Sequence, residues 1–296
     1  MRIVSLVPHA TELLYALGLG EQMVGVTHEC DFPPEAADLP AVTRNVLPDG
    51  LGPAEIDAAV RERTATGDSI YELDEELVRE LEPDLIVTQA LCHVCAVSVD
   101  EVQALAQTLP GPPRVISLDP ATYGETLGDV RTIAQATDSK DAALDLIART
   151  ARRADIVRLA VRGAPRPRVA ALEWMDPVFI AGHWTPQLIE MAGGDDVLGF
   201  AGEPSRQATW EEVAAGQPEV VIVMPCGYDA ARALVEAEEF AGRLRTVGAD
   251  HVVAVNASAY FSRPGPRLAD GLELLAHILH PDRVPTAPAE ALVVAL

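Results

Sequence analysis

Four cysteines are the residues of this chain with the clearest potential for chemistry: Cys30, Cys92, Cys95 and Cys226. Cys92 and Cys95 form a Cys-x-x-Cys pair, a spacing that serves zinc binding, iron–sulfur clusters and dithiol redox chemistry. Thiolates that gather in one place repel one another unless they share a cation or a proton. We expect the four cysteines to converge in one site, where they would either hold a metal ion or an iron–sulfur cluster or have strongly perturbed thiol pKa values.

Aromatic, imidazole and carboxylate side chains follow predicted strands in the same way as the cysteines. We expect them to form the wall of a ligand site, and they are His28, Glu29, His93, Glu173, Trp174, His183, Trp184, Tyr228 and Tyr260. Aromatic faces pack against flat ligands, whereas imidazoles bind metal ions. Taken singly, a cysteine or a tryptophan at such a position is equally compatible with a place in the core.

Acidic residues outnumber basic ones, 45 against 22, which gives a formal net charge of −23. This charge repels phosphate backbones and anionic membrane surfaces, so we exclude a nucleic acid as the main ligand. The sequence contains no Walker motif, no nucleophile elbow and no Rossmann glycine fingerprint. The expected ligand is therefore a small molecule or a metal chelate.

The first apolar run of the chain, Arg2–Leu6 followed by Val7 and Pro8, is shorter than the apolar core of roughly 7–15 residues in a secretory signal peptide. No stretch of the sequence reaches the ~18 apolar residues of a membrane span. We therefore predict a cytoplasmic protein without membrane insertion. In that reducing compartment the cysteines would be thiols or ligands rather than structural disulfides.

Short runs of valine, isoleucine and leucine alternate with helical patterns, which is typical of parallel β-sheets covered by helices. In the first half the predicted strands are Arg2–Leu6, Met23–Thr27, Asp84–Thr88 and Arg114–Leu118. In the second half they are Arg168–Leu172, Val178–Ala181, Glu219–Val223 and His251–Val255. Predicted helices include Thr11–Leu17, Leu73–Leu81, Val99–Leu109, Pro186–Met191 and Pro266–His280.

The two halves of the chain resemble each other. Leu81–Thr88 is similar to Gly216–Val223, and Leu13–Gly18 is similar to Leu188–Gly193, in the same order. Two such matches indicate a duplication, and their spacing of more than 100 residues indicates two lobes rather than a solenoid.

Between the lobes, Tyr123–Arg162 contains no predicted strand, and Asp138 precedes a long helix that starts near Ser139 and ends before Gly163. At 1.5 Å per residue that helix would run ~35 Å. We therefore predict an N-terminal α/β lobe over residues 1–122, a bridging helical segment over 123–163, and a C-terminal α/β lobe with a Pro/Ala-rich tail over 164–296. A rigid bridge predicts a small closure on ligand binding.

In α/β sheets, ligands bind beyond the carboxyl ends of the strands. Each of the four cysteines follows a predicted strand within a few residues. Parallel strands bring the loops that follow them to one edge of a sheet, and duplicated lobes would turn these edges toward each other. We therefore predict that the cysteines and the wall residues meet in one cleft between the lobes.

The chain resembles the class III substrate-binding proteins, the cobalamin and iron-siderophore binders with two α/β lobes bridged by one long helix. The matching residues are Arg2–Pro8 with Thr11–Glu12 and Leu17–Gly18, Val24–Val26, Glu82–Ile86, Ile189–Gly194, Gln217–Val220 and Asn256–Arg267. The resemblance covers nearly the whole chain up to about His280, and the pattern is closest to the cobalamin branch. It implies two Rossmann-like lobes, and binding and delivery of a ligand without catalysis.

The resemblance implies that a cobalamin or related corrinoid lies flat between the lobes, stacked against Trp174, Trp184 or Tyr260, with a cysteine or histidine near the cobalt. Two features depart from the family pattern. We expect no signal peptide, so transporter docking would not be needed, and the vitamin B12 site of the family is aromatic and polar rather than rich in cysteine.

Two alternatives remain open on the sequence. The first is a cytoplasmic protein that binds zinc or an iron–sulfur cluster through the four cysteines. The second is a thiol-dependent enzyme that acts on a small substrate bound in the cleft.

Overall fold

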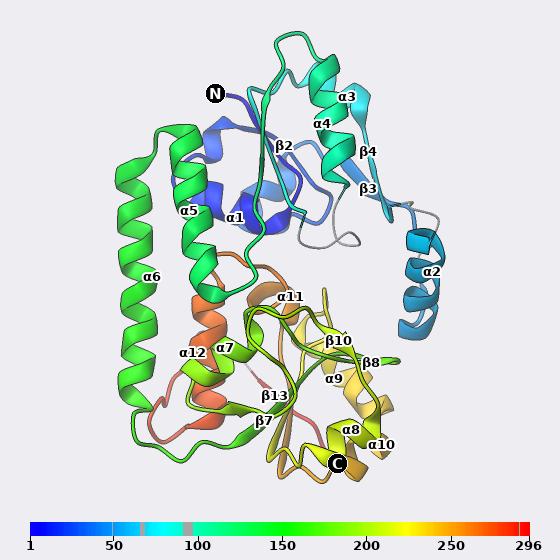
Figure 1. Ribbon diagram of the computed structural model, residues 1–296, viewed down its shortest axis with the longest axis vertical. Helices are drawn as coiled ribbons and strands as arrows, with labels where there is room; N and C mark the ends of the chain where they lie inside the picture. The colour runs from blue at the N-terminus through cyan, green and yellow to red at the C-terminus, as the bar shows by residue number, and fades with distance from the viewer. Residues whose placement is uncertain (49, 66–68, 91–96, 290) are drawn as a thin grey trace. The chain divides into compact units, whose positions relative to one another are not determined.

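The computed structural model describes residues 1–296 except 49, 66–68, 91–96 and 290 (Figure 1). The chain forms two compact units. Unit 1 comprises Met1–Pro120 and Leu127–Ile147, and unit 2 comprises Ala121–Thr126 and Ala148–Leu296. The segment 123–163, which we predict to be a separate bridge, has residues in both units. The boundaries of the lobes and the bridge stay a prediction.

Unit 1 is built on a four-stranded parallel sheet of order β2-β1-β5-β6. Its strands are β1 (Ile3–Ser5), β2 (Met23–Val26), β5 (Leu85–Thr88) and β6 (Arg114–Ser117), close to the predicted ranges. Both faces of the central strands are buried, because alternate side chains enter two different cores. Ile3 and Leu85 point into one core with α1 (Pro8–Ala16), and Val4 and Ile86 into the other with α4 (Val99–Thr108).

Other helices complete unit 1. α3 (Glu75–Glu80) precedes β5 and buries Val78 in the same core as α4. α5 (Tyr123–Thr137) follows β6 and packs Val130 and Ile133 with α1. Two short 3-10 turns, Gly20–Gln22 and Pro34–Asp38, flank β2.

An antiparallel pair that the sequence did not predict lies after β2. It consists of β3 (Thr43–Asn45) and β4 (Tyr71–Leu73), with Thr43 opposite Leu73 and Asn45 opposite Tyr71. Between them lies α2 (Pro53–Ala65), which buries none of its residues. The pair places Thr43 and Tyr71 beside the residues that follow β2.

Unit 2 contains a mixed sheet of order β10-β8-β7-β11-β12-β13, with β9 paired to β7. The strands are β7 (Arg168–Met175), β8 (Val178–Ile180), β9 (Asp195–Asp196), β10 (Arg206–Gln207), β11 (Val220–Val223), β12 (His251–Ala254) and β13 (Leu292–Val293). β7, β11 and β12 are parallel neighbours, as predicted. β8 instead runs antiparallel to β7, because the two residues Asp176 and Pro177 between them are too few for a parallel crossover.

The helices of unit 2 cover this sheet. They are α7 (Thr185–Met191), α8 (Trp210–Ala215), α9 (Ala230–Glu239), α10 (Ala241–Val247), α11 (Ala257–Tyr260) and α12 (Leu268–Leu279). Leu268, Leu272, Leu275 and Leu279 recur at helical spacing on α12, and the first three are fully buried or nearly so, whereas Leu279 is partly buried. Near the C-terminus, β13 pairs antiparallel with β12.

The predicted long helix is α6 (Lys140–Ala160), whose 21 residues span about 31 Å at 1.5 Å per residue. Its residues 140–147 belong to unit 1 and the rest to unit 2. Within unit 2, the Arg153 guanidinium bonds Asp270 at 2.5 Å and Glu273 at 2.7 Å, which ties α6 to α12. In the described part of the chain, no helix has the length and apolarity needed to cross a membrane.

Candidate functional site

In unit 1, His28 lies just beyond β2, at the carboxyl end of the sheet, and is exposed. Its Nδ1 is 2.7 Å from Thr43 Oγ1, and its backbone N–H donates to the same oxygen at 3.1 Å. Thr43 is buried, and its hydroxyl also contacts Thr27 Oγ1 at 2.8 Å. One imidazole nitrogen is therefore held by the protein, while the ring itself stays accessible.

Tyr71 on β4 completes this group. Its ring meets His28 edge-on, with centroids 4.9 Å apart, and its hydroxyl donates to Glu29 Oε1 at 2.7 Å. Burial lowers the pKa of His28, whereas the charge of Glu29 and a hydrogen bond to the backbone of Thr43 act in the opposite direction. The predicted pair His28 and Glu29 is thus supported by Thr43 and Tyr71, which the sequence did not single out.

Cys30 is buried, with 6% of its surface exposed, and belongs to the core that contains Ile3 and Leu85. Its Sγ lies 3.0 Å from Thr11 Oγ1, whose proton is donated to Ser5 Oγ at 2.9 Å. Since Thr11 has one proton, the Cys30 thiol is the donor in its contact with Thr11. Cys30, in the loop after β2, therefore belongs to a hydrogen-bonded chain with Thr11 and Ser5.

The predicted residues Cys92, His93 and Cys95 lie outside the described residues. Among the residues that the structure does describe, no group of three or more His, Cys, Asp and Glu side chains is placed to hold a metal ion. No zinc or iron–sulfur site is therefore shown in that part of the chain. The convergence of the four cysteines stays a prediction.

In unit 2, Glu173 and Trp174 lie inside β7, because this strand continues to Met175 rather than ending at Leu172 as predicted. The ring of Trp174 meets Tyr228 edge-on, with centroids 5.6 Å apart. The indole Nε1 is buried and has no hydrogen-bond partner among the described residues. Tyr228 follows β11 and is itself buried.

Two residues of α9 that the sequence did not single out support Tyr228. Arg232 places its guanidinium carbon 3.7 Å from the centre of the Tyr228 ring and donates from Nη2 to the hydroxyl at 2.9 Å. Glu236, one turn further, is only 4% exposed. Burial raises the pKa of Glu236 to about 7. The positive charge of Arg232 lowers this pKa, whereas the negative charge of Glu239 raises it further. An amphipathic helix pattern gives no sign that this acid faces inward.

The loop after β11 joins two of the predicted residues. Cys226 is exposed, and its backbone N–H donates to the Glu173 carbonyl at 3.1 Å. Gly227 donates to Ser262 Oγ at 3.4 Å, just beyond α11, whose last residue is the partly buried Tyr260. The carboxyl-end loops of unit 2 therefore bring Glu173, Trp174, Cys226 and Tyr228 together.

The predicted pair His183 and Trp184 differs in exposure. Trp184 is 6% exposed and donates from Nε1 to the Phe261 carbonyl at 2.7 Å. Its ring is therefore packed inside unit 2, and little of it is left to contact a ligand. His183 is partly buried, and burial lowers its pKa. Its φ of 52° lies in the left-handed region, and its backbone N–H donates to the Glu203 carbonyl at 2.6 Å.

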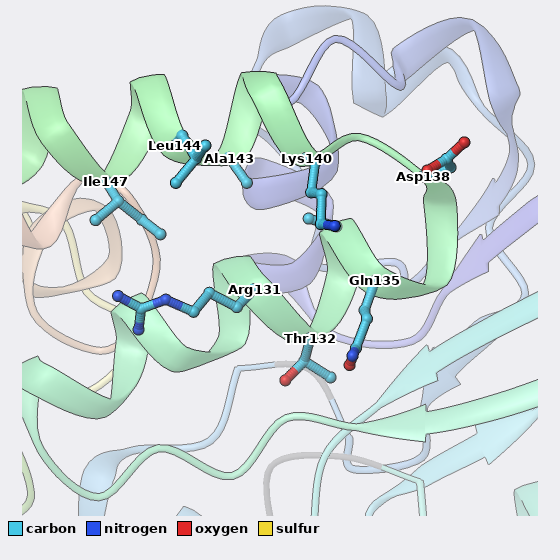
Figure 2. A pocket seen from close by; sticks show the side chains of 9 residues that line it. Arg131, Thr132, Gln135, Asp138, Lys140, Ala143, Leu144 and Ile147 are labelled. Carbon is cyan, nitrogen blue, oxygen red and sulfur yellow. The ribbon is translucent and has the colours of Figure 1, made fainter.

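A half-open groove of about 570 Å³ lies between α5 and α6 in unit 1 (Figure 2). It is lined by Arg131, Thr132, Ala134, Gln135, Asp138, Lys140, Ala143, Leu144 and Ile147. None of the predicted site residues borders it. The groove runs between two helices rather than at the carboxyl end of the sheet, which is where ligands of α/β sheets bind.

Comparison with known proteins identifies relatives over nearly the whole chain. Residues 3–259 match the family model described as periplasmic binding protein. A vitamin B12-binding protein of Vibrio cholerae is 24% identical over 292 residues, covering 92% of this chain and 86% of the relative.

Two solved structures have the same fold. The periplasmic vitamin B12-binding protein BtuF of Vibrio cholerae superimposes with a TM-score of 0.66 at 23% identity, covering 94% of this chain and 96% of that one. The apo form of the periplasmic heme-binding protein RhuT from Roseiflexus sp. RS-1 does so with a TM-score of 0.66 at 25% identity, covering 96% and 98%.

These matches test three expectations from the sequence. The two-lobe α/β fold and the assignment as a ligand-binding protein without catalysis are confirmed. The prediction of a cytoplasmic protein is wrong, because the family and both solved structures are periplasmic. The short apolar start of the chain was therefore a misleading guide to location. The chain belongs to the periplasmic binding protein family, whose members bind substrates and are not enzymes.

Proposed function

We propose that the protein binds a cobalamin or a related corrinoid and delivers it to a membrane transporter. The observation that supports this most is the match to a vitamin B12-binding protein over 92% of the chain. At that coverage the match includes residues of both units. Delivery to a transporter is what the resemblance to class III binding proteins implies.

The side chains at the carboxyl ends of the two sheets suit a flat ligand with polar groups on its rim. Trp174 in unit 2 is partly buried, with the buried Tyr228 against its ring, and offers an aromatic side chain of the kind that packs against a planar macrocycle. His28, Glu29 and Tyr71 in unit 1 offer hydrogen-bonding groups held by their neighbours. A corrinoid combines both features, because its ring is flat and its periphery bears amide side chains.

The proposal is tested by titrating the purified protein with cyanocobalamin, dicyanocobinamide and hemin. Hemin is the necessary competitor, since one of the matched structures is of a heme-binding protein. We expect saturable binding of both corrinoids, read from tryptophan quenching and calorimetry, and weaker binding of hemin. Saturable binding of hemin together with no binding of either corrinoid would contradict the proposal.

A further inference from the structure

A single hydroxyl, that of Thr43, connects three groups behind the imidazole of His28. Thr43 Oγ1 lies 3.1 Å from His28 N, 2.7 Å from His28 Nδ1 and 2.8 Å from Thr27 Oγ1. A hydroxyl has one proton to donate and two lone pairs that accept. Three contacts therefore use its full capacity, and the direction of each one can be worked out.

The backbone N–H of His28 can only donate, so it occupies the first lone pair of Thr43. The Thr27 hydroxyl is buried, and within the described residues Thr43 is its hydrogen-bond partner. A buried hydroxyl proton without an acceptor is costly, so Thr27 donates and occupies the second lone pair. The proton of Thr43 is then donated to Nδ1 of His28. The reverse assignment would leave the proton of Thr27 unused.

This direction decides which ring nitrogen of His28 has the proton. Nδ1 accepts from Thr43, so in the neutral imidazole the proton is on Nε2. Nε2 is on the ring edge away from Nδ1, the residue is exposed, and Nε2 has no hydrogen-bond partner among the described residues. Nε2 is therefore a donor aimed away from Thr43, and it lacks the lone pair that a metal ligand needs.

The negative charge of Glu29, next to the Nε2–H donor of His28, limits which acceptors can bind to this donor. Glu29 follows His28 in the chain, its Oε1 accepts from Tyr71 at 2.7 Å, and its negative charge acts on His28. A carboxylate that approached Nε2 would be repelled by Glu29, and the chain as a whole has a net charge of −23. An uncharged carbonyl oxygen would accept the same hydrogen bond without that penalty.

We infer that His28 donates from Nε2 to an uncharged carbonyl oxygen on the rim of the ligand, and that Glu29 rejects a carboxylate in the same place. This inference rests on the proposed function and specifies it: the site prefers macrocycles with amide side chains over macrocycles with carboxylates. It also assigns His28 to the rim of the ligand rather than to the axial position of its metal.

The first test needs no ligand. Long-range proton–nitrogen correlation spectra of the ¹⁵N-histidine-labelled protein report which ring nitrogen is protonated, and the His28→Gln variant assigns the signal. We expect His28 to have a bare Nδ1 and a protonated Nε2. Thr43→Ser keeps the hydroxyl and should preserve this pattern. A bare Nε2 with a protonated Nδ1 would overturn the inference.

The second test compares dicyanocobinamide, which bears amides, with dicyanocobyrinic acid, which bears carboxylates. We expect the native protein to bind the amide form at least roughly tenfold more tightly. Glu29→Gln keeps an oxygen that accepts from Tyr71 but removes the charge, and it should reduce this ratio severalfold. Glu80→Gln makes the same charge change at the exposed end of α3, which precedes β5 at the opposite edge of the sheet, and should leave the ratio unchanged.

The outcomes separate this inference from the proposed function. If both corrinoids bind and Glu29→Gln leaves the ratio as it is in the native protein, the inference about selectivity fails while the proposed function stands. If neither corrinoid binds, the proposed function fails and the selectivity fails with it. A smaller ratio in Glu29→Gln but not in Glu80→Gln supports both.

Discussion

Arg232 lies over the ring of Tyr228, with its guanidinium carbon 3.7 Å from the ring centre, and the same guanidinium donates to the Tyr228 hydroxyl at 2.9 Å. Tyr228 in turn meets the ring of Trp174 edge-on. A cation above an aromatic face stabilises the pair by about 0.5–2 kcal/mol. The position of Trp174 near the end of β7 is therefore supported by a residue in the first turn of α9.

The first prediction concerns Trp174. Trp174→Leu keeps an apolar side chain but removes the aromatic face, and we expect it to weaken corrinoid binding by roughly tenfold, since such contacts contribute about 0.5–1.5 kcal/mol beyond area burial. Trp210→Leu is the matched control, because Trp210 is also partly buried against the core of unit 2 but stacks on Phe240, with ring centroids 6.1 Å apart. Calorimetric titration with dicyanocobinamide compares the two. Equal losses of affinity in both variants would contradict a ligand-contacting role for Trp174.

The second prediction concerns the buried acid Glu236. Its pKa in the folded protein is about 7, above the ordinary value of 4.5, because burial disfavours the charged form. Between these values the folded chain binds more protons than the unfolded chain, so stability falls as the pH rises from about 4.5 to 7 and stays reduced above that. Glu236→Gln removes this titration. At pH 8 we expect the variant to be more stable than the native protein by the order of 2 kcal/mol.

The measurement for Glu236 is urea unfolding at several pH values between 5 and 8, followed by tryptophan fluorescence. All three tryptophans, Trp174, Trp184 and Trp210, lie in unit 2, so their fluorescence reports on the unit that contains Glu236. Glu238→Gln changes an exposed acid on the same helix and should leave the pH dependence as it is. A native pH dependence retained in Glu236→Gln would count against this account.

The regular elements could be predicted from the sequence because burial imposes a pattern on them. Val220–Val223 is buried on both sides, so its residues are all branched and apolar, and a strand is the natural interpretation. The helix after Ser139 is long and uninterrupted, and it was predicted to within a few residues at both ends. Such local patterns do not depend on partners elsewhere in the chain.

The partners of the site residues could not be predicted, because they come from distant positions. Tyr71 bonds Glu29 across 42 residues, through a pair of strands that has no clear pattern in the sequence. Glu236 shares a face of α9 with the buried Ala233 and Ala237, but as an acid in a helix rich in acids it would be expected to be exposed. Trp184 was predicted as a ligand wall, but its N–H bonds a carbonyl 77 residues away.

The third prediction concerns the ion pairs of Arg153. This residue binds Asp270 and Glu273 of α12 together, and its side chain is 35% exposed. Arg153→Met would leave the two carboxylates facing each other without a cation, and we expect a loss of about 1–3 kcal/mol in the stability of unit 2. Arg152→Met, at the exposed neighbouring position, should change stability by less than about 0.5 kcal/mol. Urea unfolding of both variants checks this, and similar effects of the two changes would contradict it.

The last prediction concerns the cysteines. If Cys30, Cys92, Cys95 and Cys226 bind one metal ion or cluster, the protein purified without oxygen should contain it, and Cys92→Ser with Cys95→Ser should remove it while leaving the fold intact. Cys226→Ser then decides between two arrangements. Loss of metal in this variant indicates that Cys226 shares the site with Cys92 and Cys95, whereas retention indicates that the site does not need Cys226. Elemental analysis and the visible spectrum give the metal content, and circular dichroism checks the fold. A native protein without metal would refute the metal site, and cysteines gathered in one place would then have to share protons instead of a cation.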